Sequence, residues 1–312
     1  MNHQPQDSEA ELRIDPLTGV HNTLHDVQQF AYHEWKLHGK HYEEYACEFL
    51  GTTLLVMAVV GAVAIVQAAR SPVAAVVSAM PARLLLTGFI IAFCGMVITI
   101  SPFGKLSGAH LNPAVSFGFW MLGKLGIKDT IGYIGSQMAG GLLGAVIAKP
   151  AFGMLAREVK YAAMAPGAHI SVITAFSGEF ACTFVMTLAI FYFVSHSSLA
   201  RWTPFMLLAL IPFLVLFDGT VSGCGMNPAR WIGPAYIAHI WQAAWIYLVG
   251  PIGGTALAVF FRKSGLASSP VPVTAKLFHD INYRSLFKHD QMPTKAHGMP
   301  QPQPGDETKK RS

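Results

Sequence analysis

Long apolar runs alternate with short polar breaks between residues 44 and 262, and polar sequence flanks this region on both sides. About 20 apolar residues are needed for a helix to cross a bilayer. The pattern predicts six membrane-spanning helices, over residues 47–66, 82–100, 131–148, 173–194, 204–217 and 241–261. The fifth run is short and contains Pro212, so the pattern leaves its ends open.

Composition agrees with this pattern, because 52% of the residues are hydrophobic and only 12% are charged. Soluble domains carry about 25% charged residues. The chain is therefore predicted to be an all-α membrane protein. Its four cysteines are expected to be free, since three of them fall within apolar runs where cysteine acts as a small hydrophobic residue.

The two ends of the chain are polar, unlike the apolar region between them. Residues 1–43 are polar and rich in histidine, and residues 263–312 contain many Pro, His, Lys and Gln residues, which predicts a mostly disordered tail. Basic residues favour the cytoplasmic side, so both tails are expected there. His33, His38 and His41 match no tight metal site, and a solvated tail or an amphipathic helix over 26–45 is expected instead.

A rare motif occurs twice: "SGAHLNPAVSFG" begins at Ser107 and "SGCGMNPARWIG" begins at Ser222. A Glu-Phe pair also repeats, at Glu48 and at Glu179, near the start of each set of three spans. Three spans per half insert the halves in opposite orientations, with repeat 1 over about 44–150 and repeat 2 over about 172–262. Inverted repeats of this kind place a functional site at the membrane midplane, built from discontinuous helices.

The local chemistry of Asn-Pro-Ala predicts the start of a helix, because Asn is a preferred N-cap and Pro suits the first helical position. Each motif is followed by about half a span, so two half-helices are expected to meet at the bilayer centre. Their N-termini carry partial positive charge, which opposes cations and protons. The side-chain NH₂ groups of the two asparagines are expected to face a pore. The motif residues are Asn112, Pro113, Ala114, Asn227, Pro228 and Ala229.

These motifs resemble those of the aquaporin, or major intrinsic protein, family over about residues 45–261. The resemblance rests on Glu48, "SGAHLNPAV", Glu179, "SGCGMNPAR" and "WIYLVGP". It implies an aquaporin-like fold of six transmembrane helices and two half-helices, assembled as a homotetramer with one pore per chain. It also implies a passive channel for water, small uncharged solutes such as glycerol, or both, without catalysis, cofactor or metal. The plasma membrane, or inner membrane of a cell, is the expected location, with membrane lipid as a partner and no nucleic acid.

The resemblance also implies roles for single residues. Arg230, Cys224, Val215 and either Ala92 or Phe93 match the positions of the family's selectivity filter. Water-selective members typically have His where this chain has Val215, so a wider, more apolar opening is expected. Glu48, Glu179 and His110 match residues that hold the motif loops in place. Trp231 and Ala235 do not agree on one subfamily, so water and glycerol both remain open.

Two other functions fit inverted repeats or polar tails. A secondary transporter would need coupling charges in the spans, and the candidates there are Glu48, Glu179, Asp218, His110 and Arg230. A membrane sensor or adhesion protein would use the histidine-rich tail and contain a degenerate pore. Saturable, gradient-driven flux would favour the transporter, and a tail-deleted form that still conducts would argue against the sensor.

Overall fold

The computed structural model describes residues 41–264, 272–280, 282–283 and 285–287, together with the pairs 13–14 and 21–22. The chain divides into two compact units, residues 1–42 and 43–312. In the first unit, strand β1 (Arg13–Ile14) pairs antiparallel with strand β2 (His21–Asn22). His33, His38 and most of the amphipathic helix expected there lie outside the described residues.

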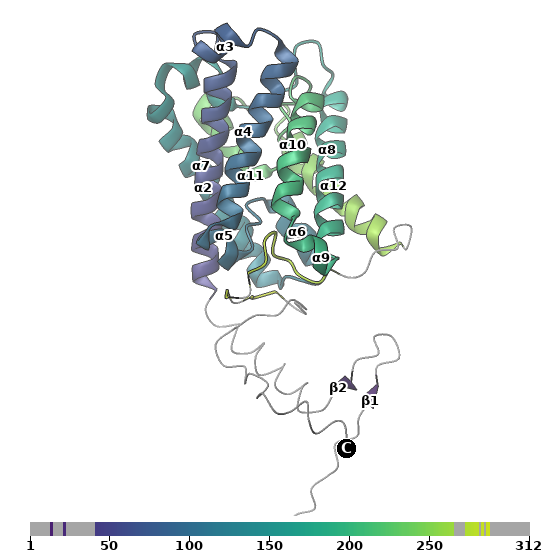
Figure 1. Ribbon diagram of the computed structural model, residues 1–312. Helices are drawn as coiled ribbons and strands as arrows, with labels where there is room; N and C mark the ends of the chain where they lie inside the picture. The colour runs from purple at the N-terminus through teal and green to yellow at the C-terminus, as the bar shows by residue number, and fades with distance from the viewer. Residues whose placement is uncertain are drawn as a thin grey trace, which may run out of the picture. The chain divides into compact units, whose positions relative to one another are not determined.

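In the described part of the second unit, the regular structure is helical (Figure 1). The six long helices are α2 (Tyr42–Gln67), α4 (Met80–Ile100), α7 (Ile127–Glu158), α8 (Val172–Phe193), α10 (Thr203–Asp218) and α12 (Ile246–Lys263). The short elements are α3 (Pro72–Val76), α5 (Pro102–Ser107), α6 (Pro113–Met121), α9 (Ser197–Ala200), α11 (Pro228–Ala238) and the 3₁₀ turn η1 (Lys160–Ala162). The predicted all-α aquaporin-like architecture is confirmed.

The long helices match the predicted spans, with differences at the ends. Helices α2, α4, α7 and α8 are each long and apolar enough to cross a membrane, whereas α10 is apolar but has only 16 residues. Helix α7 extends past the predicted end to Glu158, across a kink at Gly153, where φ is 48°. The sixth helix starts at Ile246 instead of residue 241, because residues 242–245 form turns.

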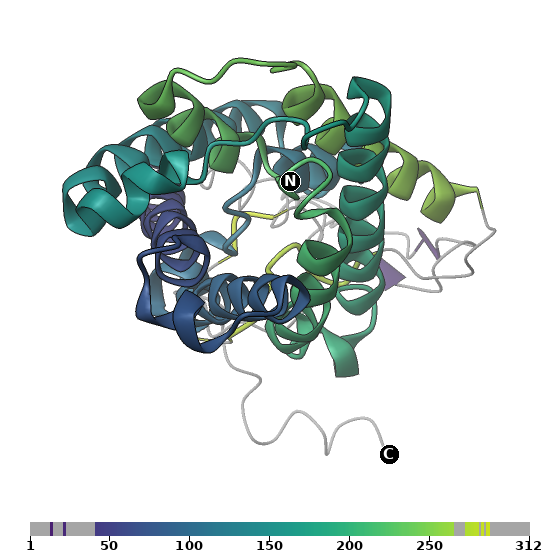
Figure 2. The same cartoon turned by 90° about the horizontal axis from the view of Figure 1, so that it is seen from above.

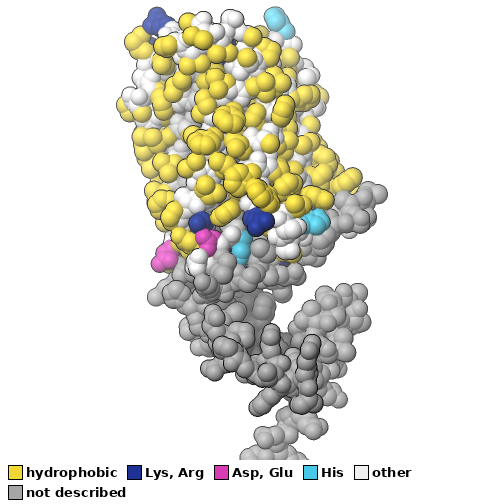
Figure 3. Space-filling model, in the orientation of Figure 1, with side chains coloured by type: hydrophobic (Ala, Val, Ile, Leu, Met, Phe, Trp, Pro, Cys, Tyr) yellow, Lys and Arg dark blue, Asp and Glu magenta, His cyan; other side chains and the backbone are white. Residues whose placement is uncertain are grey.

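Hydrophobic side chains cover the flank of the helical body, and the coloured charged side chains gather near its two ends (Figure 3). Large apolar side chains on this outer surface include Ile131, Ile173, Phe213 and Phe217, each between 64% and 69% exposed. A soluble protein rarely exposes so continuous an apolar surface. The chain is therefore a membrane protein with an apolar flank.

The two halves use the same close helix contact. Gly140 of α7 lies against the backbone oxygen of Phe49 in α2, and Gly254 of α12 lies against the backbone oxygen of Phe180 in α8. A Cβ atom at either glycine would collide with that oxygen. Small residues of this kind allow membrane helices to approach closely. The Phe of each repeated Glu-Phe pair thus marks where the first helix of a half meets the third.

The C-terminal segment departs from the expectation of a mostly disordered tail. Its described residues pack against the helical body, and Ala275, Lys276 and Leu277 are buried. Figure 1 places this segment, in yellow, at the lower end of the helical body, and in Figure 2 it is seen through the ring that the long helices form. Although the segment is polar in composition, its apolar side chains are buried against the helical body, among them Leu277, Leu286 and Phe287.

Candidate functional site

The two asparagines of the repeated motif cap the half-helices α6 and α11. The side-chain oxygen of Asn112 accepts a hydrogen bond from the Ala114 N–H at 2.9 Å, and that of Asn227 accepts one from the Ala229 N–H at 2.9 Å. Both asparagines are extended, with φ of −154° and −155°, and proline follows each of them. The sequence thus starts each half-helix as expected of an Asn-Pro pair.

The remaining side-chain nitrogens tie the two motifs to each other. Asn112 Nδ2 donates to the Met226 oxygen at 2.8 Å, and Asn227 Nδ2 donates to the Leu111 oxygen at 2.8 Å. We expected both N–H groups of each amide to be free for the pore. Since an amide nitrogen carries two N–H groups, each asparagine keeps one donor after this cross-link.

A buried carboxylate holds the first motif loop in position. Glu48 Oε1 accepts from Ser107 Oγ at 2.7 Å and from the His110 N–H at 3.0 Å. Its Oε2 accepts from the Leu111 N–H at 2.7 Å and from Gln137 Nε2 at 2.7 Å. The carboxylate therefore accepts four hydrogen bonds, and three of them come from the loop residues Ser107, His110 and Leu111.

Glu179 does the same for the second loop. Its Oε1 accepts from Ser222 Oγ at 2.7 Å and from the Gly225 N–H at 2.5 Å, and its Oε2 accepts from the Met226 N–H at 2.7 Å. Ser222 Oγ also lies 2.5 Å from Asp218 Oδ2. Both glutamates are fully buried, and their donors come mainly from the loop backbone.

The loops adopt a backbone that most residues avoid. Ala109 and Leu111 have φ of 55° and 51°, and the equivalent Cys224 and Met226 have φ of 50° and 52°. Non-glycine residues in this left-handed region cost of order 1–3 kcal/mol each. The glutamate carboxylates accept hydrogen bonds from four loop N–H groups, those of the left-handed Leu111 and Met226 and of their neighbours His110 and Gly225, which compensates for that strain.

Two tyrosines that were not predicted as site residues also bind the loops. The Tyr133 hydroxyl donates to the Ser107 oxygen at 2.6 Å, and the Tyr247 hydroxyl donates to the Ser222 oxygen at 2.7 Å. Each tyrosine precedes the close-contact glycine of its helix by the same interval, 140 − 133 = 254 − 247 = 7 residues. That shared spacing was the available signal.

One cavity brings most of the predicted pore residues together. This cavity has a volume of about 120 Å³ and is bordered by residues of both halves. The lining includes Asn112, Asn227, Arg230, Cys224, Val215, Ala92 and His110 among predominantly apolar residues. Phe93 does not line this space and is 46% exposed on the outer surface, so the geometry favours Ala92 for the position left open.

Arg230 lies in the first turn of α11, where its guanidinium is fixed by loop carbonyls. Its NH1 nitrogen donates to the Cys224 oxygen at 2.6 Å and to the Gly223 oxygen at 3.3 Å, and lies 3.0 Å from Met164 Sδ. The guanidinium is thereby held at the cavity wall. A fixed cation at this place opposes the entry of other cations.

His110 joins the first loop to two other elements. Its Nδ1 lies 3.1 Å from Ser116 Oγ, and its Nε2 lies 3.0 Å from the Ala275 oxygen. The ring stacks on Phe119 and on Phe287, with centroids 4.7 Å and 5.2 Å away. The side chain thus links the loop to the C-terminal segment.

The structure also shows where Trp231 and Cys224 lie. Trp231 does not line the cavity, since its ring packs between Trp241 and Tyr247. Cys224 lies beside Cys182 and Asp218, and the potential ligand atoms of the three side chains are within 4.8 Å of one another. No sequence pattern predicted that Cys182 would lie beside Cys224.

Comparisons with known proteins agree with this geometry. Residues 35–262 match the family model described as "Major intrinsic protein". The chain is 28% identical over 228 residues to a probable aquaporin NIP7-1 of Arabidopsis thaliana, covering 72% of this chain and 78% of that protein. It is 31% identical over 223 residues to Aquaporin-8 of Notomys alexis, covering 68% and 78%. An aquaglyceroporin structure from Plasmodium falciparum superposes with a TM-score of 0.60 at 23% identity, covering 73% of this chain and 98% of that one.

Proposed function

This chain belongs to the major intrinsic protein family, a family of channels, and on that premise we propose the following path and selectivity for it. The protein is a passive membrane channel for water and small uncharged solutes. Its conducting path runs through the cavity between the two motif loops. The observation that carries this proposal is the meeting of Asn112, Asn227 and Arg230 on one otherwise apolar cavity.

The residues of the cavity suit neutral molecules. Each asparagine retains one N–H after the cross-link between the loops, and these donors can bind the oxygen of a passing molecule. The half-helix N-termini add positive potential at the same place. A permeating water held by two donors orients its own hydrogens away from them, so a proton cannot be relayed past this point. We therefore infer that protons and cations are excluded while neutral molecules pass.

Size selection is assigned to the wall around Arg230. Ala92, Val215 and Cys224 contribute small or medium apolar side chains there. Pore diameter and lining donors decide what such channels admit. We infer that this opening admits glycerol as well as water, because apolar walls suit its carbon chain and Arg230 can donate to its hydroxyls.

The assembly and location follow from the surface and the tails. We infer a homotetramer with one pore per chain, surrounded by lipid in the plasma membrane or inner membrane of a cell. The basic residues of the tails favour a cytoplasmic location for both termini. No cofactor or nucleic acid is required for passive conduction.

The contacts of the two glutamates disfavour a coupled transporter. Glu48 and Glu179 accept hydrogen bonds from the loops they support, which is a structural use of both carboxylates. A coupling carboxylate would instead need to face the transported ion. The sensor alternative gains no support either, since the motif geometry is intact in both halves.

Flux through proteoliposomes tests the proposal. Stopped-flow light scattering after an osmotic step should show water and glycerol entry well above that of empty vesicles, without saturation. The double variant Val215→His with Ala92→Phe should reduce glycerol flux far more than water flux, because steric exclusion acts first on the larger solute. The variant Phe93→Ala is the matched control and should leave both fluxes unchanged. Water flux without glycerol flux in the wild type would refute the filter assignment.

A further inference from the structure

The described C-terminal residues 272–280, 282–283 and 285–287, here called the C-terminal strap, bind the first motif loop directly. The Leu277 N–H donates to the Gly108 oxygen at 3.0 Å, and the Ala275 oxygen lies 3.0 Å from His110 Nε2. Gly108 and His110 both lie in the loop just before Asn112, where the Asn-Pro-Ala sequence starts. The strap is therefore attached to the loop that forms the pore, and not merely to the outside of the helices.

Further contacts fix the strap at both of its ends. The Val273 N–H donates to the Val194 oxygen at the end of α8, at 2.9 Å. At the other end, Phe287 stacks on His110, and its ring lies where a Cβ atom of Gly108 would be only 2.9 Å away. These contacts hold the strap at the lower end of the helical body, where Figure 1 shows it.

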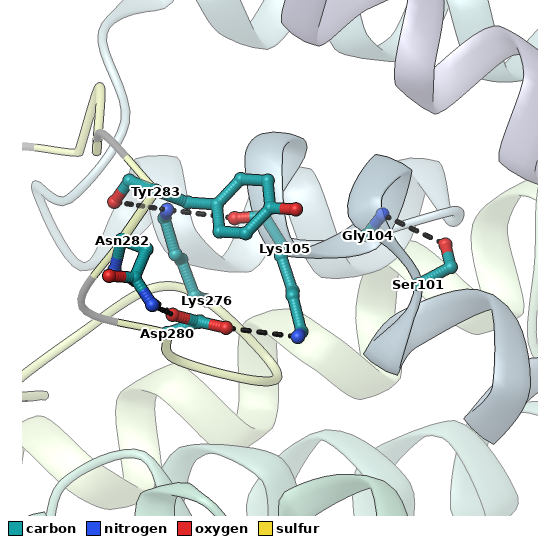
Figure 4. A network of polar contacts seen from close by, with 7 residues as sticks. All are labelled: Ser101, Gly104, Lys105, Lys276, Asp280, Asn282 and Tyr283. Atoms are coloured by element: carbon teal, nitrogen blue, oxygen red, sulfur yellow. Dashed lines mark hydrogen bonds and ion pairs between the residues drawn. The ribbon is translucent and has the colours of Figure 1, made fainter.

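The short helix α5 anchors the middle of the strap through charge (Figure 4). Lys105 Nζ lies 2.9 Å from Asp280 Oδ2, and Lys276 Nζ donates to the Lys105 oxygen at 2.9 Å. The Asn282 N–H and the Lys105 ammonium lower the pKa of the Asp280 carboxyl below its ordinary value. This ion pair is therefore fully formed at neutral pH, and it is lost only as the pH falls through that lowered pKa.

Leu277 is the strap residue that reaches the pore. Its side chain is 4% exposed and lines the same cavity as Asn112, Asn227 and Arg230. The neighbouring Lys276 is turned away from the cavity, toward Lys105 and Tyr283. The backbone thus presents an apolar side chain to the path and keeps the adjacent ammonium out of it.

We propose that the C-terminal strap is part of the conducting path, and that Leu277 forms a second, apolar constriction that limits which neutral solutes pass. This proposal rests on the proposed channel function. It assigns size selection to a residue outside the two repeats, in a segment whose composition does not suggest a pore role. An apolar constriction offers no hydrogen bonds to a permeant, so it should hinder a hydroxyl-rich solute such as glycerol more than water.

Paired substitutions in the full-length chain test the proposal in proteoliposomes. Leu277→Ala should raise glycerol flux per inserted channel by about twofold or more, with a smaller rise for water, because pore diameter limits the larger solute first. Leu277→Trp should lower both fluxes. Leu286→Ala is the matched control, because Leu286 is a buried leucine of the strap outside the cavity lining, and its flux should stay at the wild-type value.

The readouts separate failure of this inference from failure of the channel itself. Channel number is measured by quantitative immunoblot, and intact folding by gel filtration and by melting temperature in detergent. If Leu277→Ala and Leu277→Trp both fold and both conduct like the wild type, Leu277 forms no constriction. An equal rise for Leu277→Ala and Leu286→Ala also overturns its assignment. A wild type that conducts neither water nor glycerol refutes the channel function instead.

Discussion

Glu48→Gln is the substitution that most directly tests how the motif loops are held. The carboxylate accepts four hydrogen bonds on two oxygens, from Ser107, His110, Leu111 and Gln137. A glutamine side chain replaces one of those oxygens with an NH₂ group. In either orientation of the amide, one backbone N–H, that of His110 or that of Leu111, then faces the new NH₂ group and loses its acceptor.

The size of the effect can be worked from these contacts. A hydrogen bond to a charged group contributes about 1.5–3 kcal/mol, and removing the buried charge offsets part of the loss. We expect a net loss of about 2–4 kcal/mol in the free energy of unfolding. For a domain of this size, that corresponds to a fall of about 5–15 °C in melting temperature.

Tryptophan fluorescence during thermal unfolding in detergent measures this shift, and proteoliposome flux reports whether the loop still forms the pore. Glu158→Gln is the control, because Glu158 is exposed on α7 and a glutamine oxygen can still accept from the Ala69 N–H that Glu158 contacts. Its melting temperature should match that of the wild type. If Glu48→Gln also melts within a degree or so of the wild type, the carboxylate does not hold the loop.

Three further substitutions address other parts of the site. Arg230→Val removes the fixed cation at the cavity wall, so a pH gradient across vesicles monitored with a pH-sensitive dye should decay faster than with the wild type; an unchanged decay would remove Arg230 from proton exclusion. A mercurial should reduce water flux through the wild type and leave Cys224→Ser unaffected, and block that persists in the variant would locate the reactive thiol elsewhere. Gly254→Val should destabilise the protein by about 2–3 kcal/mol through overpacking against the α8 backbone, whereas Gly135→Val, whose Cβ meets nothing within 4 Å, should melt like the wild type.

The parts of the fold that depend on the spacing of apolar residues and on local chemistry could be predicted from the sequence. Apolar runs of the right length predicted the long helices, and Asn-Pro at Asn112 and Asn227 predicted two half-helix starts, because capping depends only on neighbouring residues. The repeated Glu48 and Glu179 indicated loop support, although only the structure shows which N–H groups they bind. Whether Ala92 or Phe93 lines the cavity depends on which face of α4 points inward. The sequence of α4 is apolar on nearly every side, so it does not specify that face.

Other features depend on contacts between distant segments, and the sequence alone does not show which groups meet there. Tyr133 and Tyr247 bind loop carbonyls that lie 26 and 25 residues away in sequence. His110 contacts Ala275 across 165 residues. The strap is the clearest case, because its polar composition predicts disorder while a few apolar side chains decide its packing.

The reciprocal bonds of the two asparagines have a consequence for biosynthesis. The acceptor of Asn112 is the Met226 oxygen, 114 residues later in the chain. At translation rates of about 5–20 residues per second, the first loop waits roughly ten seconds for the residue that completes it. Until then the Asn112 amide and the Leu111 carbonyl are without their final partners, so the first half should remain an unfinished, protease-sensitive intermediate in the translocon. Ribosome-stalled chains of increasing length should therefore gain protection of the first loop only after the second motif has been inserted.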